Sequence, residues 1–412
     1  MNNELLQNQL KHAHQTVPYY NSLFNNMGLI RGGKICFSDI PLLEKNKIME
    51  TPAMFISNKY LSKYKTGDLL CKRTSGSTGR CMSVYWLPND YYISNIEAWK
   101  YRYKWFNISV KDKYVSFHST LYVNGNIINS PDSIIMNKKN VSFNKTMLNN
   151  ENIHIYIKKI QEFQPTWMLV QPSVLHALLS ESDSSEREIL NHLQYIELIS
   201  EYEHKSTRRF FQESLPKVKF SNMYGTTETG CVALECPFGK QHILNNAIVE
   251  VFDDNYSSPT AQEGNIVLTS LRNTAMPLIR YCIGDRGRVF TSKCKCGFEG
   301  HDISITLGRE SDIIELPNGE KRHSSVFWQI VEEVLYEYPD SITQFHVIQD
   351  GPDSLRIHLA LKEKYKNWTN AIETSFKNTV GRYLGHYMSC QFEYQIGNPL
   401  RNGNKLNVFS RI

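Results

Sequence analysis

Short apolar runs typical of buried strands alternate with amphipathic stretches typical of helices through the middle of the chain. Residues 167–170 and 195–199 have the strand pattern, while residues 173–179 and 206–213 have the helical one. Such alternation predicts an α/β fold with a mostly parallel sheet. At 412 residues the chain is also too long for one simple hydrophobic core, so two domains are expected.

The pattern changes towards both ends of the chain. Between residues 248 and 289 strands follow one another closely, which predicts a small β subdomain. Residues 4–29 predict two helical pieces that Pro18 separates. Beyond Gly308 an α+β segment is expected, with helix 324–336, strands 344–348 and 355–361, and helix 368–384.

Charge and hydropathy exclude several classes of protein. A formal net charge of +5 is small for this length and does not favour nucleic-acid binding. No run approaches 18 apolar residues, so no membrane span is expected. The N-terminal residues Met1–Glu4 lack the basic and apolar regions of a secretory signal, which favours a cytoplasmic location.

One short segment combines hydroxyls, glycines and flanking cations. Small residues leave backbone N–H groups free to surround an anion, hydroxyls donate further hydrogen bonds, and a cation offsets phosphate charge. The segment is not a Walker A loop, because no Lys-Ser or Lys-Thr pair follows its glycine. From these residues alone, a phosphate-binding loop and a plain surface turn both remain open. The residues are Thr74, Ser75, Gly76, Ser77, Thr78, Gly79 and Arg80.

Further segments give a more specific resemblance. Tyr224-Gly225-Thr226-Thr227-Glu228 resembles a motif of the adenylate-forming superfamily, which includes acyl-CoA synthetases, luciferases and nonribosomal-peptide adenylation domains. The order of the segments agrees with that family, since residues 74–79, 224–228, 281–285, 308–312 and Lys405 follow one another as its motifs do. Residues 16–20, 40–45 and 275–281 look more closely like the phenylacetate–CoA ligase branch and its capsular-polysaccharide-type relatives.

This resemblance implies an activity and a domain division. Residues 1–308 would bind ATP and the acyl substrate, and residues 309–412 would form a small mobile domain. The enzyme would form an acyl-adenylate and pyrophosphate from ATP and a carboxylic acid, then pass the acyl group to the thiol of CoA or a carrier protein. Transfer to an amine or hydroxyl, and a catalytically degenerate binding module with this fold, remain open.

The resemblance also assigns roles to single residues. Residues 74–80 would hold the β- and γ-phosphates, with Arg80 as the cation. Thr227 would contact the α-phosphate, and Glu228 would hold Mg²⁺, which prefers carboxylate oxygens. Asp285 would accept hydrogen bonds from the ribose hydroxyls. The Tyr224–Thr226 segment would lie beside the adenine, with Ser200–Glu203 in the place of a further adenine-contacting stretch.

Three further residues belong to the expected C-terminal domain. Arg309 would contact ribose or phosphate, and Asp312 would be the hinge, although an ordinary turn aspartate fits it equally. Lys405 would bridge the carboxylate and the α-phosphate as the catalytic lysine. Family members usually have glycine directly before this lysine, but here Asn404 precedes it, so a solvated basic tail remains an alternative.

A second kind of site is indicated by cysteine spacing. Cys236 and His242 lie six positions apart, and Cys294 and Cys296 form a tight pair. A Cys₃His set is a usual arrangement for structural zinc. Cys231 could replace one ligand, and a group of reduced thiols without metal is the alternative. With nine cysteines and no export signal, a disulfide framework is not expected.

The acyl substrate is the least defined part of the prediction. Residues 116–125 and Met223 are expected to face the acyl group, and the aromatic side chains Phe117 and Tyr122 would suit a planar or aryl acid. His118 is interpreted as a packing or polar positioning residue and not as a base.

Overall fold

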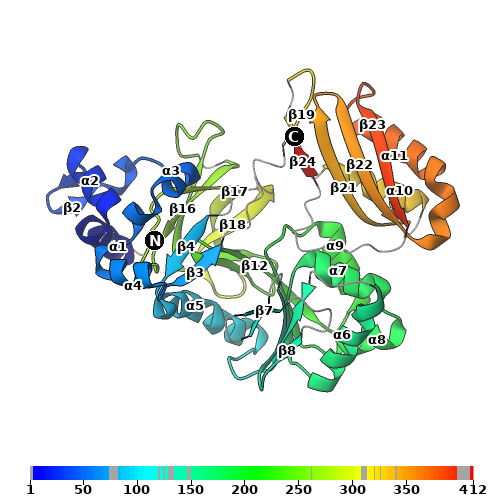
Figure 1. Cartoon of the computed structure of the whole chain (residues 1–412), viewed down its shortest axis with the longest axis horizontal. Coiled ribbons are helices and arrows are strands. Elements are labelled where there is room, and N and C mark those ends of the chain that lie inside the picture. Colours follow the sequence, from blue (N-terminus) through cyan, green and yellow to red (C-terminus); the bar gives the residue numbers. More distant parts are fainter. Residues whose placement is uncertain are drawn as a thin grey trace. The chain divides into compact units, whose positions relative to one another are not determined.

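The computed structural model describes residues 3–73, 82–118, 121–123, 126–128, 134–145, 150–260, 262–307, 313–319, 321–324, 326–338, 341–396 and 409–411. The chain divides into two compact units (Figure 1). Unit 1 comprises Met1–Val110, Glu197–Ser200 and Lys219–Thr306, and unit 2 comprises Lys111–Ile196, Glu201–Val218 and Leu307–Ile412. The expected division at residue 308 stays a prediction.

The helices are α1 (Asn3–Thr16), α2 (Pro18–Asn26), α3 (Lys45–Glu50), α4 (Leu61–Thr66), α5 (Pro88–Phe106), α6 (Asn150–Phe163), α7 (Pro172–Glu181), α8 (Ser184–Asn191), α9 (Lys205–Ser214), α10 (Val326–Glu337) and α11 (Thr369–Leu384). The strands are β1 (Ile30–Arg31), β2 (Lys34–Ile35), β3 (Leu70–Arg73), β4 (Ser83–Trp86), β5 (Tyr114–His118), β6 (Leu121–Val123), β7 (Asn126–Ile128), β8 (Ile134–Met136), β9 (Asn140–Asn144), β10 (Trp167–Val170), β11 (Tyr195–Ile199), β12 (Lys219–Thr226), β13 (Gly230–Glu235), β14 (Gln241–Ile243), β15 (Ala247–Phe252), β16 (Gly264–Ser270), β17 (Tyr281–Lys293), β18 (Glu299–Leu307), β19 (Ile313–Glu315), β20 (Lys321–His323), β21 (Ile342–Gly351), β22 (Ser354–Leu361), β23 (Ser389–Ile396) and β24 (Phe409–Arg411).

The largest sheet has 12 strands in the order β15-β16-β17-β18-β14-β13-β12-β11-β10-β5-β9-β8. Parallel pairing joins β10, one of the expected strands, to β5, and β5 to β9. Antiparallel pairing joins β15 to β16 and β16 to β17, in the part where strands were expected to follow closely, and it also joins β12 to β13. The α/β class is therefore confirmed, together with its β-rich part.

The N-terminal helices form as the sequence predicted and have a defined packing role. Pro18 begins α2, a position where its missing N–H costs nothing. The buried side chains of α1 and α2 share one core with Met276, Leu278 and Ile279. Gln9 Nε2 donates to Asn273 O at 2.7 Å. The two helices therefore hold the segment that connects β16 to β17.

Helix α5 supports the strands of unit 1 through one buried face. Ser94, Ala98, Arg102 and Phe106 are buried at intervals of four residues, which places them on one face. Gly230 (φ +76°) lies against this face, and a Cβ there would be 2.7 Å from Ser94 Oγ. Only glycine satisfies both the left-handed backbone and this close approach.

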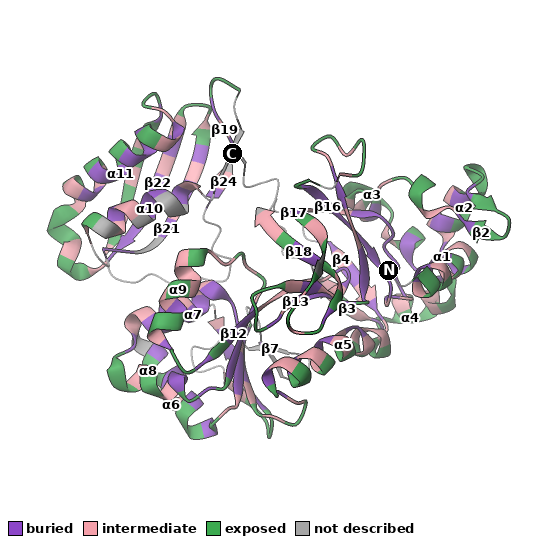
Figure 2. Ribbon diagram, turned by 180° about the vertical axis from the view of Figure 1, so that it is seen from behind, coloured by how far each residue is buried: buried purple, intermediate pink, exposed green. Residues whose placement is uncertain are grey.

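The C-terminal segment has its own core. Its sheet has the order β23-β22-β21-β24, and α10 and α11 pack on one face of it (Figure 2). Leu355, Ile357 and Leu359 point to that face and are fully or almost fully buried, while Arg356 and His358 alternate with them. All members of this core come from residues 314–409. The expected α+β segment is thus present.

No helix in the described part of the chain is both long and apolar enough to cross a membrane.

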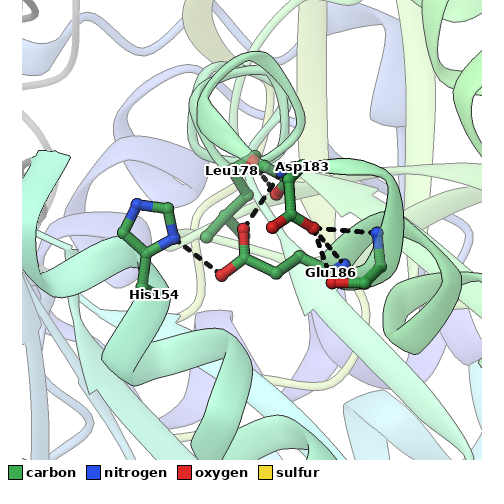
Figure 3. A network of polar contacts seen from close by, with 6 residues as sticks. His154, Leu178, Asp183 and Glu186 are labelled. Carbon is green, nitrogen blue, oxygen red and sulfur yellow. Dashed lines mark hydrogen bonds and ion pairs between the residues drawn. The ribbon is translucent and has the colours of Figure 1, made fainter.

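In unit 2, a capping network joins α6 to α8 (Figure 3). Asp183 is the N-cap of α8, and its Oδ1 accepts hydrogen bonds from the N–H groups of Ser185 and Glu186. The Glu186 carboxylate accepts from the Asp183 N–H at 3.1 Å and lies 2.6 Å from His154 Nδ1. This reciprocal capping box satisfies N–H groups that a helix cannot pair internally.

The cap predicts a pH-dependent stability. The Glu186 N–H, followed by the Ser185 hydroxyl, lowers the pKa of Asp183, so the charged form stabilises the fold above the ordinary carboxyl pKa of about 3.9. Asp183→Ala should lower the thermal midpoint at neutral pH, whereas Asp183→Asn should retain most of it, because Asn caps well. The advantage of the wild type over Asp183→Asn should disappear as the pH falls through the lowered pKa. Thermal unfolding followed by circular dichroism, at neutral pH and below the lowered pKa, measures these midpoints. An unchanged difference between the wild type and Asp183→Asn in acid would contradict the prediction.

Candidate functional site

The turn between β12 and β13 carries the predicted Tyr224–Glu228 motif and is held from several sides. The strands pair antiparallel, with a register shift between Tyr224 and Gly225. Thr226 Oγ1 accepts a hydrogen bond from the Thr229 N–H at 3.1 Å. Trp86 Nε1 donates to Thr227 O at 3.1 Å. The main chain of the motif is therefore fixed by its own turn and by β4.

The two predicted catalytic residues of this turn differ in exposure. Thr227 is half-buried, and Glu228 is only 5% exposed. A carboxylate this deeply buried is stable only with a compensating donor or cation. Carboxylate oxygens are the ligands that Mg²⁺ prefers, so the donor chemistry fits the expected role of Glu228.

Two of the predicted motifs meet at a side-chain hydrogen bond. The Tyr224 hydroxyl donates to Asp285 Oδ2 at 2.7 Å, although the two residues are 61 positions apart. Tyr224 comes from β12 and Asp285 from β17. The structure thus brings together the expected adenine and ribose segments, which the sequence could relate only by their order.

Arg280, the residue directly before β17, sets how this strand begins. Its position was covered in the sequence only by the range 275–281. Arg280 has a φ of +51° and is 6% exposed. Its Nε and Nη2 bind the Glu250 carboxylate at 3.1 and 3.0 Å. Its Nη1 donates to the carbonyl oxygens of Ser38 and Ile40. A charged arginine in such a bidentate pair, five residues before Asp285, fixes the direction in which β17 begins.

Several predicted residues lie outside the described residues. These are Thr74, Ser75, Gly76, Ser77, Thr78, Gly79, Arg80, Arg309, Asp312 and Lys405.

The four predicted metal ligands do come together. One ligand atom from each of Cys236, His242, Cys294 and Cys296 lies within 4.8 Å of the others. Cys236 Sγ is 3.7 Å from Cys294 Sγ, and His242 Nε2 is 3.2 Å from Cys296 Sγ. Among the described residues no other group of this kind is found, and Cys231 is not part of the set.

Glycine turns shape both thiol-bearing loops of this cluster. Gly239 (φ +71°) donates its N–H to Cys236 O, and Gly297 (φ +77°) donates to Cys294 O, at 2.9 and 3.0 Å. A left-handed residue two or three positions after a cysteine turns the chain back, so that both loops present their sulfurs to one point. The glycines were visible in the sequence, but the approach of the loops depends on β14 and β18.

Asp302 and Phe298 complete the cluster and were missed by sequence analysis. His242 Nδ1 lies 2.5 Å from Asp302 Oδ1, and both side chains are buried. Phe298 stacks on the His242 ring at 4.3 Å. Burial lowers the pKa of His242 against the opposing effect of Asp302, which favours a neutral imidazole. A carboxylate on one ring nitrogen, with the other facing thiols, is the usual outer shell of a zinc histidine.

The expected adenine-contacting acids bind other protein groups in unit 2. Glu201 accepts hydrogen bonds from the N–H and hydroxyl of Ser173 at 3.0 and 2.9 Å. Glu203 forms a bidentate pair with Arg208, with both distances 2.6 Å. Each acid therefore has a structural role at the start of a helix, α7 for Glu201 and α9 for Glu203.

Comparison with known proteins agrees with this geometry. Residues 73–273 match the family model described as AMP-binding enzyme. A phenylacetate-coenzyme A ligase of Thermus thermophilus is 30% identical over 199 residues, which cover 46% of this chain and 43% of the relative. The matched region therefore spans less than half of that relative's length.

Solved structures with a similar fold cover most of the chain. A 2-hydroxyisobutyryl-CoA ligase in the postadenylation state has a TM-score of 0.73 at 15% identity, covering 99% of this chain and 88% of that one. An anthranilate CoA ligase with anthranoyl-AMP has a TM-score of 0.53 at 16% identity, covering 82% and 66%. The resemblance to adenylate-forming enzymes is confirmed.

A buried ion pair lies directly behind the Tyr224 motif. Arg102 of α5 binds Glu197 of β11 through Nε and Nη2 at 2.7 and 2.6 Å, and both side chains are at most 5% exposed. Arg102 Nη2 also lies 3.4 Å from Met223 Sδ, one residue before Tyr224. The guanidinium stacks 4.7 Å from the Trp99 ring. The pair therefore joins α5, β11 and β12.

Removing one partner of this pair should destabilise the protein strongly. Glu197→Gln leaves a buried charged Arg102 without its counter-ion, and we expect a loss of about 3–5 kcal/mol in the free energy of unfolding. The double variant Arg102→Met, Glu197→Leu should be more stable than either single variant, because it buries no charge. Glu188→Gln, which breaks the exposed Lys217–Glu188 pair, is the control and should change little. Urea unfolding distinguishes these cases; a Glu197→Gln midpoint equal to the control would refute the assignment.

Proposed function

We propose that the protein is an ATP-dependent carboxylate-activating ligase. In the first step a carboxylate oxygen attacks the α-phosphorus of ATP, the bond to pyrophosphate breaks, and an acyl-adenylate forms. In the second step a thiol sulfur attacks the acyl carbon, the C–O bond to AMP breaks, and the thiol loses its proton. The products are an acyl thioester and AMP. Coenzyme A is the thiol we favour, because the phenylacetate relative is a coenzyme A ligase.

The Tyr224–Asp285 hydrogen bond is the observation that carries this proposal. A carboxylate can accept hydrogen bonds from both hydroxyls of a ribose, and a phenol beside it presents a flat face for adenine stacking. The pair lies in the neighbourhood of a domain matched as an AMP-binding enzyme. Thr227 and Glu228 follow Tyr224 in the same turn, where a nucleotide bound at the pair would direct its α-phosphate.

The remaining roles rest on the order of the family-like motifs along the sequence. Residues 74–80 would bind the β- and γ-phosphates, and Lys405 would offset the charge that develops between the carboxylate and the α-phosphate. Bound Mg²⁺ neutralises phosphate charge, and Glu228 would hold it. Arg309 would contact the nucleotide, and Asp312 would be the hinge of a C-terminal domain that begins near residue 309. The separate core of residues 314–409 supports that division.

The Cys236, His242, Cys294 and Cys296 set would hold a structural zinc ion. Four protein ligands leave no open position, so such an ion stabilises its surroundings and takes no part in the chemistry. Its loops join β13, β14, β17 and β18. Zinc would therefore fix the far end of the strand that carries Asp285.

Three variants separate nucleotide binding from chemistry. Asp285→Ala should weaken ATP binding about 10- to 100-fold, because hydrogen bonds to a charged group are worth about 1.5–3 kcal/mol. Tyr224→Phe, which keeps the ring, should weaken it only a few-fold. Lys405→Ala should leave ATP affinity nearly unchanged but remove most pyrophosphate release with a panel of carboxylic acids.

Calorimetric ATP titration and pyrophosphate release measure these effects. Product analysis with coenzyme A, carrier protein or amines then identifies the acceptor. ATP binding by the wild type without pyrophosphate release for any acid would indicate the degenerate binding module, the alternative that Asn404 favours. Unchanged ATP affinity in Asp285→Ala would reject the ribose assignment.

Metal content tests the zinc site. The purified wild type should contain about one zinc ion per chain, as expected for a closed Cys₃His set. Cys296→Ser should lose most of it and unfold at a lower temperature, because metal binding energy becomes folding energy. Cys231→Ala is the control and should retain the metal, since Cys231 lies outside the set. Wild-type protein that takes up no zinc after refolding in its presence would support the metal-free thiol alternative.

A further inference from the structure

Trp86 of β4 makes a hydrogen bond to the turn that carries the predicted catalytic residues. Its indole is 0% exposed, and its Nε1 donates to Thr227 O, 141 positions along the chain, at 3.1 Å. An indole has a single N–H and no acceptor, so this bond uses its whole hydrogen-bonding capacity. The ring also packs edge-on against Tyr91, with 5.7 Å between the ring centroids. Packing therefore fixes the direction in which the N–H points.

The bond sets the orientation of the peptide group between Thr227 and Glu228. This peptide is trans, so its carbonyl oxygen and its N–H point in opposite directions. With the oxygen bonded towards β4, the peptide can rotate only if the buried indole N–H loses its acceptor, which is unfavourable. The side chains of Thr227 and Glu228 flank this peptide group, so their directions depend on it.

The same strand leads to the predicted phosphate loop. β3 and β4 pair as an antiparallel hairpin, in which Arg73 lies opposite Ser83 and Leu70 opposite Trp86. Residues 74–80 belong to the connection that leaves β3 at Arg73 and enters β4 at Ser83. Trp86 is thus three positions from the residue at which that connection returns to the hairpin.

A neighbouring main-chain group of β4 bonds the segment that leads to Asp285. Tyr85 O, one residue before Trp86, accepts a hydrogen bond from Asn273 Nδ2 at 3.1 Å. Asn273 lies between β16 and β17, and Asp285 is part of β17. Strand β4 therefore connects the predicted phosphate loop, the Thr227 turn and the segment that leads to Asp285. All of these residues belong to unit 1.

We propose that Trp86 is a positioning residue for acyl-adenylate formation. Its N–H holds the Thr227–Glu228 peptide in the orientation in which Thr227 contacts the α-phosphate and Glu228 holds Mg²⁺. Because the indole is fully buried, it acts through Thr227 and not by contact with ATP or the acid. The role rests on the proposed function, which assigns the α-phosphate and the metal to these two residues. Small errors in the placement of such groups slow a reaction strongly.

An isosteric replacement removes the N–H and keeps the packing. Trp86→3-benzothienylalanine puts sulfur in place of the N–H and retains the shape of the indole. ATP is titrated by calorimetry in EDTA and again with Mg²⁺. Without metal the affinity should match that of the wild type, because Tyr224 and Asp285 are unchanged. The increase in affinity that Mg²⁺ gives should be about three- to tenfold smaller, as expected for one lost hydrogen bond.

Pyrophosphate release measures the effect on the reaction. At saturating ATP, acid and Mg²⁺, the variant should have a kcat about tenfold below that of the wild type. Its thermal unfolding midpoint should stay close to the wild-type value, because the ring volume is kept. A purely structural role of Trp86 would instead lower the midpoint and leave the kcat of the folded enzyme unchanged. Trp86→Phe loses the same N–H and part of the ring, so both its kcat and its midpoint should be lower.

Trp105 provides the matched control. Its Nε1 is also buried, but it has no hydrogen-bond partner within the described residues. Trp105→3-benzothienylalanine should therefore keep the wild-type Mg²⁺ effect, kcat and unfolding midpoint. Equal losses at both positions would assign the effect to the analogue and overturn the role of the bond to Thr227.

The outcomes separate this inference from the function on which it rests. A wild-type Mg²⁺ effect and kcat in Trp86→3-benzothienylalanine overturn the positioning role. Weaker ATP binding in EDTA also overturns it, because the change would then extend to the Tyr224–Asp285 pair. Absence of pyrophosphate release by the wild type with every acid overturns the proposed function, while the ATP titrations still decide whether Trp86 positions the Thr227–Glu228 turn.

Discussion

The segment between β16 and β17 is held by hydrogen bonds to parts of the chain more than 180 residues away, and the nucleotide site depends on it. Gln9 binds Asn273 O, Tyr85 O accepts from Asn273, and the Ile279 N–H donates to the Tyr20 hydroxyl. Arg280 adds a buried ion pair with Glu250 and two carbonyl contacts. A segment without regular structure must satisfy its polar backbone in this way. Because β17 continues directly from it, the position of Asp285 is set by the N-terminal helices.

Contacts with other parts of the chain also hold the two residues of the proposed nucleotide site, so that they need no large movement to meet. Tyr224 and Asp285 are each anchored by main-chain contacts outside the pair, one by the β12–β13 turn and one by Arg280. The hydrogen bond between them is therefore preorganised, and a bound nucleotide would not have to order it. At the other end of β17 the cysteine and histidine cluster plays a comparable part, since Asp302 and Phe298 hold His242 in one orientation.

Much of the secondary structure was predictable, because its causes are local. Helices α1 and α2 meet at Pro18 as expected, and β10 and β11 occupy the predicted residues. Helices α6 and α8 were not predicted. Their residues mix polar and apolar types, and α8 owes its start to the Asp183 capping box and to His154 of α6. The strands β5 and β9 were also missed, since polar residues alternate there with valine and phenylalanine although the residues of both faces of β9 are buried.

The sequence alone determined the α/β class, the order of the family motifs and the four residues of the cysteine and histidine cluster, because these follow from local periodicity and residue type. Tertiary structure decided which groups meet. It joined Tyr224 to Asp285 and placed Glu201 against Ser173. It also placed Asp302 behind His242. Such contacts depend on strand register and chain crossings over long separations, which no local pattern encodes.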